Sequence, residues 1–101
     1  MKKIIEGRKY DTETARQVAE WSNRDYGNFG YTAETLYLKR TGEFFLHGEG
    51  GARSKYRECE GVNLFGSGEK IVPLSEQEAR AWCEEHCDGD TYEEIFGEVA
   101  E

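Results

Sequence analysis

The stretch Glu34–His47, ETLYLKRTGEFFLH, decides the fold predicted for this chain. Residues of high β-propensity alternate along both arms, and Thr41-Gly42 supplies a turn between them. Two extended arms joined by a glycine turn are typical of an antiparallel β-hairpin. We expect Leu36, Leu38 and Phe45 to face the core, while a register shifted by one residue would turn the alternate set inward.

Two elements are predicted before this hairpin. Lys3–Tyr10 is expected to form a short strand whose apolar residues are Ile4, Ile5 and Tyr10. Asp11-Thr12 offers a side-chain oxygen that caps a helix. The spacing of Ala15 and Val18 predicts that this helix runs on to about Asn23. The loop that follows is rich in Asn, Asp and Gly and also carries three aromatic side chains, Tyr26, Phe29 and Tyr31.

After the hairpin, a third antiparallel strand is predicted at Lys70–Val72, ended by Pro73, the only proline. Tyr56–Phe65 is ambiguous, with a loop as the first interpretation. Ser75–Glu78 has the sequence of a capping box, in which the first and fourth residues satisfy each other's backbone amides. It predicts a helix with an inward stripe of Ala79, Trp82, Cys83 and His86.

Asp90–Glu93 repeats the capping pattern and predicts a last helix, with Tyr92, Ile95, Phe96 and Val99 on one side. The predicted element order is β-α-β-β-β-α-α. This order indicates one α+β domain over residues 1–101: a small three- to four-stranded antiparallel sheet with one N-terminal and two C-terminal helices.

Composition favours a cytoplasmic protein. No apolar stretch approaches the roughly 20 residues that cross a bilayer, and the N-terminal residues lack the apolar core of a signal peptide. Cys59, Cys83 and Cys87 form an odd set without framework spacing, which is consistent with a reducing compartment.

The sequence gives little support for a metal site, a catalytic site or a phosphate-binding site. Cys83, His86 and Cys87 would share one helix face, but structural zinc needs four ligands, and no second ligand pair is present. No catalytic signature surrounds any cysteine. The glycine-rich segment Gly48–Lys55 lacks both the spacing and the helix of a phosphate-binding loop. We therefore predict a non-enzymatic protein with no metal and no cofactor.

Charge gives the clearest functional signal. Leu74–Glu101 holds ten carboxylates and one base, Arg80, a balance of −9 in a chain whose formal net charge is −8. The negative electrostatic field of such a segment repels nucleic acid and attracts basic protein grooves. The bases of Arg53–Arg57 are too few to reverse this field. They are interpreted as an ion-pairing surface for the acidic helices of this chain or of a second copy.

Several segments resemble, as a set, small proteins carried on phages and conjugative elements of Gram-positive gut bacteria: Lys2–Gly7, Tyr10–Thr12, Glu34–Tyr37, Phe45–Gly51 and Pro73–Ser75. Small acidic proteins in that setting include anti-CRISPR inhibitors, several of which act on Cas9. The resemblance implies a phage protein that binds a CRISPR effector and blocks its loading with DNA or its cleavage of DNA.

The charge and the resemblance together predict a protein-binding inhibitor of a defence nuclease, whose carboxylates imitate the phosphates of a duplex. The alternative is a regulatory binding module of a mobile element, acting as a homodimer. The acidic residues would pair with Arg and Lys of the partner, and the aromatic loop would anchor the contact. The predicted contact residues are Glu76, Glu84, Glu85, Asp88, Glu93, Glu94, Glu98, Tyr26, Phe29 and Tyr31.

Overall fold

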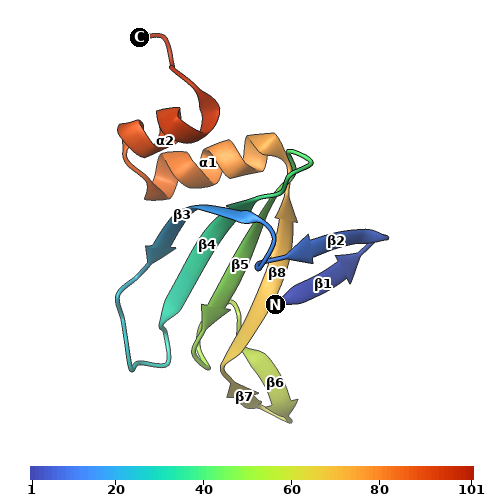
Figure 1. Ribbon diagram of the computed structural model, residues 1–101. Coiled ribbons are helices and arrows are strands. Elements are labelled where there is room, and N and C mark those ends of the chain that lie inside the picture. Colours follow the sequence, from blue (N-terminus) through green and yellow to red (C-terminus); the bar gives the residue numbers. More distant parts are fainter.

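A four-stranded antiparallel sheet with two helices on one face forms the centre of the protein (Figure 1). The structure is a computed structural model that describes all residues, 1–101. The strand order in the sheet is β3-β4-β5-β8, and two short hairpins, β1–β2 and β6–β7, lie outside it. The predicted α+β class and the two C-terminal helices are confirmed. The elements are β1 (Lys2–Ile5), β2 (Arg8–Asp11), β3 (Arg16–Ser22), β4 (Thr32–Leu38), β5 (Phe44–Gly50), β6 (Glu58–Gly61), β7 (Leu64–Gly66), β8 (Gly68–Leu74), α1 (Glu76–His86) and α2 (Gly89–Phe96).

The predicted hairpin forms the middle of the sheet as β4 and β5, with Leu36 opposite Leu46. Leu36 is fully buried on the helix side of the sheet. Phe45 is fully buried as well, but on the other side, where it packs against Tyr10 of β2 and stacks on Tyr37. The expectation that Phe45 shares a core with Leu36 is therefore wrong. Both faces of this strand pair are covered, so the apolar pattern could not distinguish them.

Helix α1 begins as predicted. Ser75 Oγ accepts from the Glu78 amide at 3.1 Å, while Glu78 Oε1 accepts from the Ser75 amide at 2.9 Å. Its inward stripe buries Ala79, Trp82 and Cys83 against the β4–β5 pair. Neither α1 nor α2 combines the length and the apolarity that crossing a membrane requires.

No N-terminal helix is present, and this prediction is wrong. Arg16–Ser22 is instead strand β3, which pairs with β4 along its length. The Asp11 side chain accepts from the Glu13 amide at 2.9 Å, and this local contact closes a turn instead of capping a helix. Pairing with β3 satisfies the backbone groups that β4 would otherwise expose at its edge. The β-bulge between Gln17 and Ala19 lets two adjacent apolar residues pack against the same core, which imitates a helical pattern.

Four smaller predictions also change. The predicted strand Lys3–Tyr10 is a hairpin that turns at Glu6-Gly7, both with positive φ. Pro73 lies within β8 and does not end it, as an edge strand permits. The ambiguous segment Tyr56–Phe65 contains β6 and most of β7. The cap of α2 is Asp88, not Asp90, because the Asp88 carboxylate accepts from the Thr91 amide at 2.8 Å.

Glycines in β5 allow the following loop to cross the strand closely. The ring of Tyr56 lies directly over Gly48, where an added Cβ would be 1.9 Å from the ring. At Gly50 an added Cβ would be 2.2 Å from Ser54 Oγ. Any side chain at these positions would push the loop away from the sheet. The glycines of this segment therefore make room for a close contact between β5 and the loop that follows it.

We expect Gly48→Ala to destabilise the protein by roughly 3 kcal/mol or more, because the methyl group and the Tyr56 ring cannot occupy the same space. Urea unfolding at neutral pH measures the change. The matched control is Gly89→Ala at the first turn of α2, where an added Cβ meets no atom within 4 Å. Equal stability of the two variants would contradict the proposed close packing.

Candidate functional site

The predicted acidic residues of α1 and α2 divide into two groups. Three of them are engaged by the chain itself. Asp88 caps α2, and its hydrogen bonds to Thr91 lower the pKa of its carboxyl group. Glu93 Oε2 accepts from the Val99 amide at 2.8 Å, and Glu76 pairs with Arg80 at 3.2 Å. These three carboxylates contribute to the helices, so a partner would compete with existing contacts.

The other four predicted carboxylates are exposed: Glu84, Glu85, Glu94 and Glu98. Glu85 lies 3.8 Å from His86 Nε2, and the other three make no hydrogen bond or ion pair within the chain. Glu84 and Glu85 are fixed on α1, Glu94 is fixed on α2, and Glu98 follows the end of α2. We name these four residues the acidic helical surface.

The aromatic loop between β3 and β4 is held by Asn23. Its amide side chain donates to the Gly30 carbonyl at 2.9 Å and accepts from the Thr32 amide at 3.1 Å. The loop leaves the side chains of Tyr26 and Phe29 exposed, each residue at 67%. Tyr31 is half-buried, with its ring 5.1 Å from that of Tyr26. Two of the three predicted aromatic contacts are therefore available to a partner.

A shallow pocket of about 390 Å³ brings part of the acidic helical surface next to this loop. Its lining includes Asn23 and Gly30 from the loop and Glu85 from the end of α1. The structure therefore places Glu85 beside the ends of this loop, although none of the three aromatic candidates lines the pocket. It does not place Glu94 or Glu98 at this pocket.

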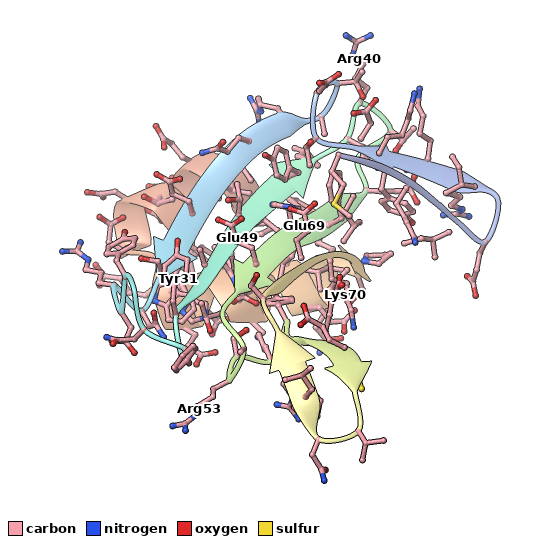
Figure 2. The ribbon with its side chains drawn as sticks, turned by 90° about the horizontal axis from the view of Figure 1, so that it is seen from below. Tyr31, Arg40, Glu49, Arg53, Glu69 and Lys70 are labelled. Atoms are coloured by element: carbon pink, nitrogen blue, oxygen red, sulfur yellow. The ribbon has the colours of Figure 1, made fainter.

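A second acidic region lies on the sheet face turned away from the helices, which Figure 2 views directly. A groove of about 620 Å³ is lined there by Tyr31, Glu49, Glu58 and Glu69. Glu69 is engaged with His47, 3.2 Å from its Nε2. Sequence analysis missed this region, because the carboxylates come from different strands and form no run in the sequence.

Glu34 is a buried carboxylate at the centre of the molecule, with 1% of its surface exposed. Trp82 Nε1 donates to its Oε1 at 3.1 Å, and the Tyr56 hydroxyl donates to its Oε2. Lys55 Nζ lies 2.9 Å from the same Oε2, and His86 Nε2 lies 3.9 Å from Oε1. These contacts join β4, the loop before β6 and helix α1.

The charge of Glu34 is stable at neutral pH. Burial raises the pKa of Glu34, but hydrogen bonds from Tyr56, Lys55 and Trp82 outweigh burial and bring it below the ordinary value. Burial and the adjacent Glu34 carboxylate both raise the pKa of the Tyr56 hydroxyl. The pair therefore consists of a carboxylate and a neutral phenol, and neither leaves a buried side-chain oxygen without a hydrogen-bond partner. One sequence signal could have identified Glu34: it shares a strand face with Leu36 and Leu38.

The cysteines do not assemble a reactive site. Cys83 is fully buried in the core, and burial raises the pKa of its thiol to about 12. Burial also raises the pKa of Cys87, while Cys59 is exposed on β6. His86 lies between two tryptophan rings, 4.2 Å from Trp21 and 5.1 Å from Trp82. The Cys83 and Cys87 thiols are therefore protonated at neutral pH, which makes them poor nucleophiles.

Tyr56→Phe should lower the free energy of unfolding by about 2 kcal/mol at pH 7, because the buried Glu34 carboxylate loses a donor. The pKa of Glu34 is below 4.5 in the folded protein, so its contribution is present above pH 4.5 and is lost as pH falls through the folded value. Urea unfolding across this range should show the difference between variant and wild type shrinking in acid. Tyr26→Phe, at an exposed hydroxyl, is the control. A pH-independent difference would contradict this account.

No protein-family model, curated protein or solved structure matches this chain.

Proposed function

We propose that this chain is a non-enzymatic protein that occupies a cationic cleft of a nucleic-acid-binding protein and excludes the nucleic acid. A CRISPR effector nuclease, with Cas9 as the first candidate, is the target that the sequence resemblance implies. The observation that supports this proposal best is the set of exposed carboxylates without strong partners, Glu84, Glu85, Glu94 and Glu98.

Rigid placement makes Glu84, Glu85 and Glu94, the three of these carboxylates that lie on helices, suited to binding. Helix α1 is fixed by three buried residues, Ala79, Trp82 and Cys83, and by a complete capping box. Helix α2 packs Tyr92, Ile95 and Phe96 on the same core. Carboxylates on fixed helices lose less conformational freedom on binding than carboxylates on a flexible tail. They also attract a cationic partner over distance and speed its association.

The arrangement of reactive groups favours binding over catalysis. No group of three or more His, Cys, Asp or Glu side chains is placed to hold a metal ion. The one deeply buried carboxylate, Glu34, has both oxygens hydrogen-bonded to donors of the fold, and the Cys83 thiol is protonated. The exposed Tyr26 and Phe29 rings, in contrast, suit a contact that fills pockets on a protein surface.

The homodimer alternative receives less support. It needs free bases in Arg53–Arg57 to meet the acidic helices of a second copy. Lys55 is already paired with the buried Glu34, and Arg57 lies over the ring of Phe65 at 4.8 Å. Arg53 lies 6.0 Å from the ring of Phe29. Each base of the patch therefore has a contact within its own chain.

We expect the wild-type protein in molar excess to inhibit DNA cleavage by purified Cas9 loaded with guide RNA. The triple variant E84Q/E85Q/E94Q should inhibit about tenfold more weakly, because each exposed ion pair contributes roughly 0.5 kcal/mol. Raising the salt concentration should weaken the wild type more than the variant. The readout is the protein concentration that halves cleavage.

The control variant E6Q/E13Q/E20Q removes the same number of charges from exposed positions outside the helices. It should inhibit like the wild type. Undiminished cleavage in the presence of excess wild-type protein would rule out Cas9 as the target. Equal weakening of both variants would show that net charge, and not the acidic helical surface, drives binding.

A further inference from the structure

The β6–β7 hairpin carries a cluster of exposed apolar side chains, among them Val62, the most exposed large apolar residue of the molecule. Val62 is 96% exposed, Leu64 57% and Phe65 42%, all within four residues at its tip. The hairpin projects from the end of the sheet remote from the helices (Figure 1). Single apolar residues on a surface are ordinary, but a cluster on a projecting element commonly marks a contact site.

The fold does not require these side chains. Neither core cluster includes any residue from Glu58 to Gly66. The radius of gyration is 14.8 Å, above the roughly 13 Å of a compact domain of about this length, as expected when hairpins project. A two-stranded hairpin gains little stability by itself in water. Three apolar side chains at its tip therefore bring no evident benefit to the free protein.

The hairpin nevertheless has a defined shape. Its strands pair from Glu58 opposite Gly66 to Gly61 opposite Leu64, and Asn63 closes the turn with a φ of 56°. The guanidinium of Arg57 covers the ring of Phe65 from the base. These contacts define the arrangement of the tip in the free protein's structure.

Carboxylates accompany the apolar tip. The Glu60 side chain lies across the backbone of Gly66, where an added Cβ would be 2.1 Å from Oε1. Glu58 likewise packs on Gly68 and lines the acidic groove of the sheet face. Two hairpins from two copies would bring these carboxylates together, and an anionic membrane surface would repel them. The complementary partner is a protein surface with positive charge beside an apolar pocket.

We infer that the β6–β7 hairpin inserts Val62 and Leu64 into an apolar pocket of the target protein, with Lys or Arg side chains at the rim of that pocket meeting Glu58 and Glu60. The inference rests on the proposed function and names the element that anchors the complex. The hairpin supplies the apolar contact, while the acidic helical surface supplies electrostatic attraction.

The test compares binding of V62S/L64S and wild type to Cas9 loaded with guide RNA, by biolayer interferometry alongside the cleavage assay. The variant should bind about tenfold more weakly or worse, mainly through faster dissociation, because buried apolar anchors control the lifetime of a complex. The salt dependence should stay that of the wild type, which distinguishes this loss from a loss of charge. The conservative variant V62I/L64M should retain binding.

The matched control is I4S/V99S, which removes two exposed apolar side chains, 61% and 55% exposed, from outside the hairpin and both core clusters. It should bind like the wild type. Circular dichroism and urea unfolding should show all variants folded, since none of the altered residues lies in the core.

Cys59 supplies a second readout, because it is exposed on β6 opposite Phe65. Its alkylation by iodoacetamide, followed by mass spectrometry, should slow by about tenfold or more when Cas9 covers the hairpin. If the wild type neither binds nor inhibits Cas9, the proposed function fails and this inference with it. If the wild type binds while V62S/L64S binds equally and Cys59 stays reactive, only the hairpin inference is overturned.

Discussion

The buried carboxylate of Glu34 is the constraint on which the rest of the structure depends. Removing a charged group from water costs several kcal/mol unless hydrogen bonds and an opposite charge replace the lost hydration. Here Tyr56, Trp82 and Lys55 provide that replacement. They come from segments far apart in the sequence, so satisfying one carboxylate fixes the sheet, the crossing loop and helix α1 relative to one another.

This constraint also positions both proposed binding elements. Trp82 holds α1 to Glu34 from one side of the helix, and the opposite side then presents Glu84 to solvent. Glu85 is exposed beside the pocket that Glu34 and His86 line. Tyr56 holds the crossing loop, and β6 begins two residues later. The contact between Tyr56 and the Glu34 carboxylate therefore also sets the direction in which the β6–β7 hairpin projects. The Tyr56 ring in turn fits over β5 only because Gly48 has no Cβ atom.

Carboxylates serve three separate purposes in this chain. Glu78 and Asp88 satisfy the amides that every helix leaves unpaired at its N-terminus. Glu34 organises the interior. The acidic helical surface has no comparable duty inside the protein, and its charge remains available to a cationic partner. The net charge counts all of these carboxylates alike, but only those of the acidic helical surface are available for binding a partner.

Local chemistry made part of this protein predictable from its sequence. The β4–β5 hairpin follows from alternation around a glycine turn, and the start of α1 follows from the Ser75 capping box. The exposure of Glu84 and Glu94 follows from the apolar stripes on the opposite helix faces. Tertiary contacts decided the rest. β3 is a strand because the edge of β4 needed a backbone partner, and Phe45 lies on the second face because the β1–β2 hairpin covers it. The role of Glu34 depends on hydrogen-bond donors supplied by Tyr56 and Trp82. Residue spacing in the sequence cannot predict these contacts, because they form only when distant segments meet in the folded protein.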